Sequence, residues 1–111
     1  MILRTHLLDN ALIVDIQLKE ANLSNADQFK AELHSLINSG NKYVIVNFEQ
    51  VIYVDSSFLG ALVSALKLAM NNGGDIAVVG LNSDIRSLFQ LVRLDKVFKI
   101  YTNTQEALTG A

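Results

Sequence analysis

The chain has 111 residues, half of them apolar and 18% charged, and its formal net charge is −2. This length fits one domain, residues 1–111, whose core needs no disulfide or metal for stability. The absence of cysteine excludes disulfide bonds and thiolate chemistry. A small negative charge with scattered Lys and Arg argues against a nucleic-acid partner.

A membrane segment is not expected either. The longest stretch without a charged residue runs from Ser56 to Leu66, far short of the ~20 apolar residues of a membrane span. A chain without cysteine also agrees with a reducing compartment, so we expect a cytoplasmic protein.

The first two expected elements are strands that pair as a hairpin. Residues 2–8 and 11–18 are rich in aliphatic and β-branched side chains, and Asp9 and Asn10 between them form the turn. The second run is almost continuously aliphatic, which is typical of a strand covered on both faces.

A helix is expected next. Ser24, with Asp27 three residues later, resembles a capping box, and Gly40 ends the helix. The apolar residues between these two signals follow helical spacing and predict the inward face: Ala26, Phe29, Leu33, Leu36 and Ile37.

Strands and helices alternate in the rest of the chain. Strands are expected at 43–48, 75–81 and 96–101, while 51–55 either continues the first of these or follows it. Helices are expected from Ser57 to the Asn-Gly-Gly run at 72–74, after a cap at Ser83, and over 104–108. This order predicts an α/β fold with a mostly parallel five-stranded sheet, an N-terminal antiparallel edge hairpin, and helices after strands 2–5.

The stretch VDSSFLGALV, residues 54–63, places one acid and two hydroxyls between a strand and a helix. In open α/β sheets, ligands bind at such carboxyl ends of strands. Asp55 or Ser56 can cap the helix, an ordinary structural role worth ~0.5–2 kcal/mol. Capping leaves Ser57 unexplained. A phosphate on Ser57 would meet free N–H groups and the positive end of the helix dipole, so this serine is the candidate phosphate acceptor.

The helix that follows carries a single charge, Lys67. Its apolar spacing predicts an inward arc of Leu59, Leu62, Val63, Leu66 and Met70. The opposite arc is small or mildly apolar: Ser57, Gly60, Ser64, Lys67 and Asn71, with Ala61 and Leu68 beside it. Either a partner protein docks on this face with little desolvation, or other elements of the same fold cover it.

Two segments carry a resemblance to a known family: DSSFLGALV at 55–63 and GGDIAVVGLNSDIRSLFQLVRLDKVFKIYTNTQEAL at 73–108. Over essentially its whole length the chain resembles the STAS domain of bacterial anti-sigma-factor antagonists. The resemblance implies a protein that is not an enzyme and needs no cofactor or metal. Such a protein binds an anti-sigma factor that is also a serine kinase, and this capture releases a sigma factor. The kinase phosphorylates the second serine of D-S-S, here Ser57, and a metal-dependent serine phosphatase restores the free form.

The resemblance also implies where the partner binds. At two positions in that region, this chain departs from the family pattern. Family members often have glycine after the acceptor serine, whereas this chain has Phe58, whose ring could hinder a kinase or anchor a partner. A G-x-L-D pattern often precedes the first helix, and Asn22 in KEAN takes the place of its aspartate. The expected partner-binding residues are Asn22, Asp55, Ser56, Phe58, Gly60, Ala61 and Ser64.

Parts of the sequence are also compatible with three other functions. A receiver domain would explain Asp55 at a strand end, but the acidic pair that would hold Mg²⁺ is missing. A serine hydrolase lacks G-x-S-x-G, and both His6 and His34 precede Ser57 in the chain. The strongest alternative keeps the fold without phosphorylation: a STAS scaffold or subunit of a larger signalling or lipid-transport complex.

Overall fold

The computed structural model describes residues 1–110. It begins with the expected antiparallel hairpin, β1 (Leu3–Leu8) paired with β2 (Ala11–Ile16). The turn between the strands places Asp9 at φ +54°, a left-handed conformation that Asp tolerates better than most residues. The predicted hairpin is therefore confirmed, with β2 ending two residues earlier than expected.

The five-stranded sheet has the order β1-β2-β4-β6-β7. After the hairpin its strands are parallel: β4 (Tyr43–Asn47), β6 (Asp75–Val79) and β7 (Lys99–Tyr101). This confirms the predicted mostly parallel sheet with an antiparallel edge hairpin. The start of the expected 96–101 strand is instead a 3-10 turn at Leu94–Lys96.

A second, two-residue pairing joins β3 (Glu20–Ala21) to β5 (Tyr53–Val54) in parallel. The stretch 51–55 is thus a separate short strand that follows β4. The pairing ties together the two segments that lead into the first and second helices.

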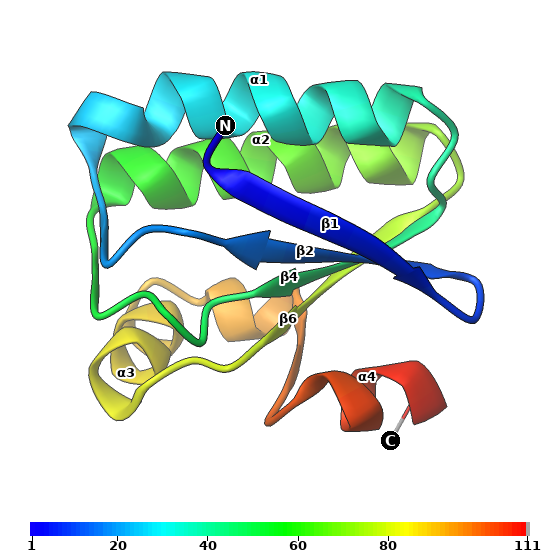
Figure 1. Cartoon of the computed structure of the whole chain (residues 1–111). Helices are drawn as coiled ribbons and strands as arrows, with labels where there is room; N and C mark the ends of the chain where they lie inside the picture. Colours follow the sequence, from blue (N-terminus) through cyan, green and yellow to red (C-terminus); the bar gives the residue numbers. More distant parts are fainter. Residues whose placement is uncertain (111) are drawn as a thin grey trace.

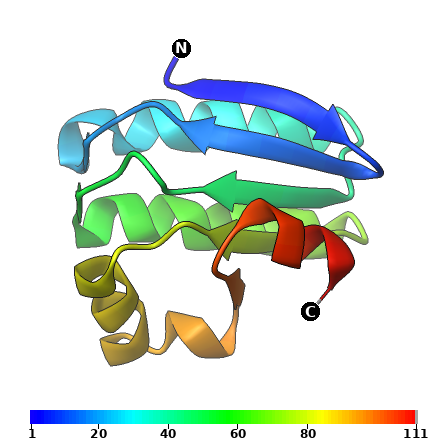
Figure 2. The same ribbon diagram turned by 60° about the horizontal axis from the view of Figure 1, so that its bottom comes forward.

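Helices cover both faces of the sheet. The long helices α1 (Leu23–Asn38) and α2 (Ser56–Asn71) lie side by side on one face (Figure 1). The short α4 (Thr104–Thr109) lies on the other face, in front of the sheet in Figure 2. Helix α3 (Ser83–Leu91) packs against the end of the main core through Ile85 and Phe89.

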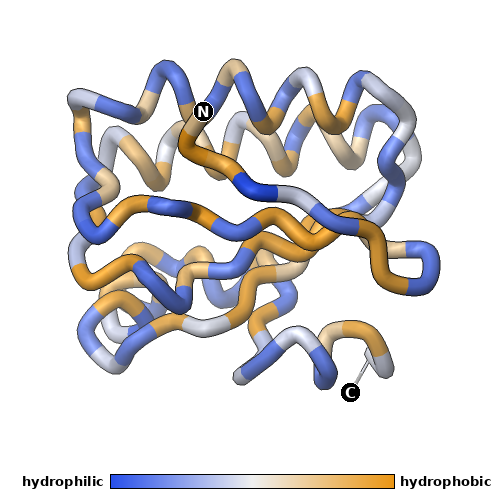
Figure 3. Tube along the Cα trace, in the orientation of Figure 1, coloured by the Kyte–Doolittle hydropathy of each residue, from blue (hydrophilic) through white to orange (hydrophobic). Residues whose placement is uncertain are grey.

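The core follows the alternation of the strands. In β2, Leu12, Val14 and Ile16 face the main core beneath α1 and α2, whereas Ala11 and Ile13 face the smaller cluster beneath α4. The central strands are correspondingly mostly hydrophobic (Figure 3). Of residues 1–110, no helix is both long and apolar enough to cross a bilayer.

The inward face of α2 differs from the single arc that the spacing predicted. Its buried residues form a wider band: Phe58, Leu59, Ala61, Leu62, Ala65, Leu66 and Ala69. Met70, placed inward by the spacing, is 61% exposed. The reason is that α2 packs on the sheet and on α1 at once, so it buries two adjoining stripes.

Candidate functional site

Asp55 joins the starts of the two long helices. Its Oδ1 accepts a hydrogen bond from the Phe58 N–H at 3.1 Å, which caps α2. Its Oδ2 accepts one from the Leu23 N–H at 2.9 Å, at the first residue of α1. The capping role proposed for Asp55 or Ser56 therefore falls to Asp55, and Ser56 is the first helical residue, exposed to solvent.

Removing this carboxylate should loosen both helix starts. We expect Asp55→Ala to lower the free energy of unfolding by about 1–4 kcal/mol, because each of the two capping bonds contributes ~0.5–2 kcal/mol. Asp55→Asn keeps one acceptor oxygen and should cost less. Urea denaturation measures the difference, with Ser56→Ala as the matched control. A loss for Asp55→Ala no larger than that of the control would contradict the double cap.

Asn22 lies at the same edge of the molecule. Its side-chain oxygen accepts from the Ser24 N–H at 3.0 Å, and its own N–H donates to Asn25 Oδ1 at 2.9 Å. The capping box of α1 is therefore Asn22 with Asn25, and the predicted box of Ser24 with Asp27 is wrong. Similarly, α3 is capped by Asn82 rather than Ser83, since Asn82 Oδ1 accepts from the Ile85 N–H at 2.8 Å.

Ser57 is the second residue of α2 and is half-buried. Within residues 1–110, its hydroxyl makes no side-chain hydrogen bond, and neither the Ser56 nor the Ser57 N–H has a backbone partner. Such unpaired N–H groups, together with the helix dipole, favour negative charge at this end. The hydroxyl is thus not held by a hydrogen bond within the described residues, and it lies at a helix start where negative charge is favoured.

Phe58 does not belong to the exposed site. Its side chain is 0% exposed and stacks on Phe29 of α1, with ring centroids 4.1 Å apart. The expectation that Phe58 contacts a partner is therefore wrong for this conformation, because the ring fills the core between the two helices. Since it points inward, the ring does not shield Ser57 either.

The remaining residues expected to contact a partner differ in how exposed they are. Gly60 is exposed, with open space where a Cβ would lie. Ala61 is only 7% exposed, which leaves little of its surface for the expected partner contact. Ser64 is half-buried, and its hydroxyl lies 3.2 Å from His34 Nε2 of α1. Part of the α2 face is thus covered by α1, which was the alternative to a partner.

Burial lowers the pKa of His34 below 6.5, and the nearby Lys30 ammonium lowers it further. The unfolded chain therefore takes up a proton before the folded protein does. We expect the stability that depends on neutral His34 to be fully present well above pH 6.5 and to be lost as the pH falls through 6.5 toward the lowered pKa of the folded protein. Denaturation series for wild type and His34→Gln measure this. If both series have the same slope over this range, His34 is not responsible.

Sequence reasoning missed three large apolar side chains near the starts of α1 and α2. Leu23 is 73% exposed, Ile52 61% and Tyr53 53%. Ile52 and Tyr53 also line a groove of about 220 Å³ against α3, with Val54, Asp84, Ile85 and Leu88. The stretch 51–55 was expected to continue or to follow the strand at 43–48. It instead forms only the two-residue pairing of β5 with β3, outside the main sheet, and this leaves Ile52 and Tyr53 in solvent.

The described residues contain no group of three His, Asp or Glu side chains arranged to hold a metal ion. The site is therefore a surface of caps, hydroxyls and exposed apolar groups. It brings Asn22, Asp55, Ser56 and Ser57 to one edge, between the starts of α1 and α2.

Comparison with known proteins places this geometry in a family. The sequence-family model of the STAS domain matches residues 4–107. A Thermotoga maritima protein named as a candidate anti-sigma factor antagonist is 33% identical over 91 residues, which are 81% of this chain and 80% of the relative. The anti-sigma-B factor antagonist of Staphylococcus aureus is 26% identical over 86 residues, 78% of this chain and 80% of the relative.

The fold agrees with these sequence matches. A crystal structure of a Thermotoga maritima protein, also named as a candidate anti-sigma factor antagonist, superposes with a TM-score of 0.88 at 27% identity. The superposition covers 97% of this chain and 92% of the other. The resemblance inferred from the sequence is thereby confirmed, and the chain belongs to the STAS domain family.

Proposed function

We propose that this protein is an anti-sigma factor antagonist whose binding is switched by phosphorylation of Ser57. The observation that carries the proposal is a serine hydroxyl at the start of α2 that has no hydrogen-bond partner among residues 1–110 and lies beside the double cap of Asp55. The names of the relatives agree with it. In this role the protein is a cytoplasmic binding partner and a kinase substrate, not an enzyme, and it needs no cofactor.

In the unmodified state, the proposed docking surface consists of the α2 start and the apolar residues beside it. Leu23, Ile52 and Tyr53 together resemble the apolar centre of a protein interface, with the polar residues of the caps around them. Asn22, Ser56 and Gly60 complete the surface. The partner is an anti-sigma factor with serine kinase activity, and its capture frees the sigma factor.

A phosphate on Ser57 adds about −1.5 to −2 charges in the middle of this surface. Desolvating that charge against an apolar interface is unfavourable, so the partner dissociates. The helix itself is not disrupted, because negative charge is favoured in its first turn. A serine phosphatase then restores the binding form.

The proposed function is tested by displacement. A purified complex of the cognate anti-sigma factor and its labelled sigma factor is titrated with the unmodified protein, and free sigma factor is measured by fluorescence anisotropy. We expect stoichiometric release, and no release by the protein that has first been phosphorylated by the kinase. Failure of the unmodified protein to release sigma factor would favour a STAS scaffold or subunit of a larger complex.

Tyr53 should contribute strongly to this binding. Exposed aromatic residues near the centre of an interface often cost 2 kcal/mol or more when truncated, so we expect Tyr53→Ala to weaken anti-sigma factor binding by about 10–100-fold. Met70→Ala is the matched control, because Met70 is 61% exposed at the other end of α2. Isothermal titration gives both affinities. Equal affinities for the two variants would place the interface elsewhere.

A further inference from the structure

The edge strand β1 has one unpaired side. The hairpin closes on the pair Leu8 and Ala11, and the Gln17 N–H donates to the Ile2 carbonyl at 2.8 Å. Because hydrogen-bonded and non-hydrogen-bonded pairs alternate along an antiparallel ladder, the even-numbered residues of β1 bond to β2. The N–H and C=O groups of Leu3, Thr5 and Leu7 therefore point outward, away from the sheet.

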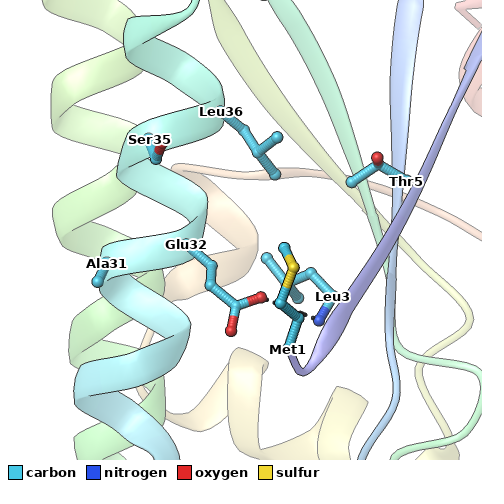
Figure 4. A pocket seen from close by; sticks show the side chains of 7 residues that line it. All are labelled: Met1, Leu3, Thr5, Ala31, Glu32, Ser35 and Leu36. Carbon is cyan, nitrogen blue, oxygen red and sulfur yellow. Dashed lines mark hydrogen bonds between the residues drawn. The ribbon is translucent and has the colours of Figure 1, made fainter.

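Glu32 of α1 occupies the beginning of this edge. Its carboxylate accepts hydrogen bonds from the N–H groups of Ile2 and Leu3, both at 3.2 Å. Figure 4 shows the bond with Leu3. Gln28 holds the same carboxylate with a bond of 2.8 Å. Within residues 1–110, the outward N–H groups of Thr5 and Leu7 have no partner. The open part of the edge is thus the short stretch 5–7.

An apolar groove of about 310 Å³ runs beside this stretch, between β1 and α1. Figure 4 shows the side chains that line it, Met1, Leu3, Thr5, Ala31, Glu32, Ser35 and Leu36. Leu7 lies on the same face of the sheet, because it pairs with Leu12 of the main core, yet it is 69% exposed. The edge therefore offers both an exposed apolar side chain and an apolar groove.

We propose that β1 pairs with β1 of a second copy of this chain, antiparallel about a two-fold axis at His6. In this register, Thr5 lies opposite the second copy's Leu7, and each such pair exchanges two backbone hydrogen bonds. The bonds use the outward groups that Glu32 leaves free. A register centred on Thr5 would instead need the Leu3 N–H, which Glu32 already holds.

The same register fills the groove. Side chains directly opposite one another across antiparallel strands point to the same face, with Cβ atoms about 4.5–5.5 Å apart. The second copy's Leu7 therefore lies beside Thr5, at the groove between β1 and α1, and the symmetry places Leu7 of the first copy in the second groove. Such a self-complementary contact closes as a dimer and does not propagate into a filament.

Cross-linking tests the register directly, because an introduced cysteine would be the only thiol in the chain. His6 faces its counterpart as a non-hydrogen-bonded pair with Cα atoms about 4.5 Å apart, within the range of a disulfide. Arg4→Cys is the matched control, on the same strand and face but four residues out of alignment with its counterpart. In glutathione redox buffer, we expect His6→Cys to form the disulfide dimer at least about 10-fold faster. Equal rates would overturn the register.

Sedimentation of the cysteine-free protein tests the dimer itself, at concentrations up to about 1 mM. We expect a concentration-dependent dimer that Leu7→Lys weakens at least about 10-fold, since a lysine would enter the apolar groove. Leu91→Lys, at an exposed leucine that ends α3, should leave it unchanged. A monomer at every concentration would overturn the proposal, as would equal dimerisation of Leu7→Lys and wild type. None of these measurements involves Ser57 or an anti-sigma factor, so they can fail while the proposed function holds.

Discussion

Replacing Phe58 with alanine is expected to lower the free energy of unfolding by about 3–5 kcal/mol. The ring is 0% exposed and stacks on Phe29 with centroids 4.1 Å apart. Its removal leaves a cavity between α1 and α2 and abolishes an aromatic pair, which is worth ~0.5–1.5 kcal/mol beyond the buried area. Circular dichroism during urea denaturation measures the change, which is a large part of the stability of a small domain.

Met70→Ala is the control, because it removes a large apolar side chain from the same helix at a position that is 61% exposed. This substitution should change stability by no more than about 0.5 kcal/mol. If Phe58→Ala costs less than about 1 kcal/mol, the ring does not fill the core. Phe58 would then return to the set of partner contacts.

Ser57→Asp is expected to weaken binding of the anti-sigma factor on the order of 100-fold. A fixed negative charge in an apolar interface costs several kcal/mol, and each 1.4 kcal/mol corresponds to a tenfold change in affinity. Stability should change by less than about 1 kcal/mol, because an acid in the first turn of a helix is tolerated or favoured. Isothermal titration and urea denaturation give the two quantities.

Ser57→Ala separates charge from shape in this experiment. It removes the hydroxyl without adding charge, so its affinity should stay within about threefold of wild type. Two results would contradict the switch. One is a loss of stability for Ser57→Asp that parallels its loss of binding, and the other is equal weakening by Ala and Asp.

The order of elements was predictable because local patterns determine it. Near-continuous apolar runs such as those within 43–48 and 75–81 are typical of strands covered on both faces. The pairing of β3 with β5 was not predictable. Each strand has two residues, too few for any periodicity, and the pair Glu20 and Tyr53 is far apart in sequence. This pairing nevertheless decides which side chains surround the site.

The site was only partly predictable for a related reason. The position of Ser57 at a strand-to-helix junction follows from the sequence alone. The inward direction of Phe58 does not, because it depends on α1 lying beside α2. The cap of α1 was misassigned because Asn22 and Ser24 are both good capping residues. Which of the two residues caps α1 depends on where the chain enters the helix. Asp55 fixes that point by accepting a hydrogen bond from the Leu23 N–H.

The most direct test of the switch is the mass of the intact protein after incubation with its cognate kinase and ATP. The account predicts the addition of one phosphate, located on Ser57 by fragmentation, in wild type and in Ser56→Ala but not in Ser57→Ala. An unmodified protein, or a phosphate on any other residue, would contradict it.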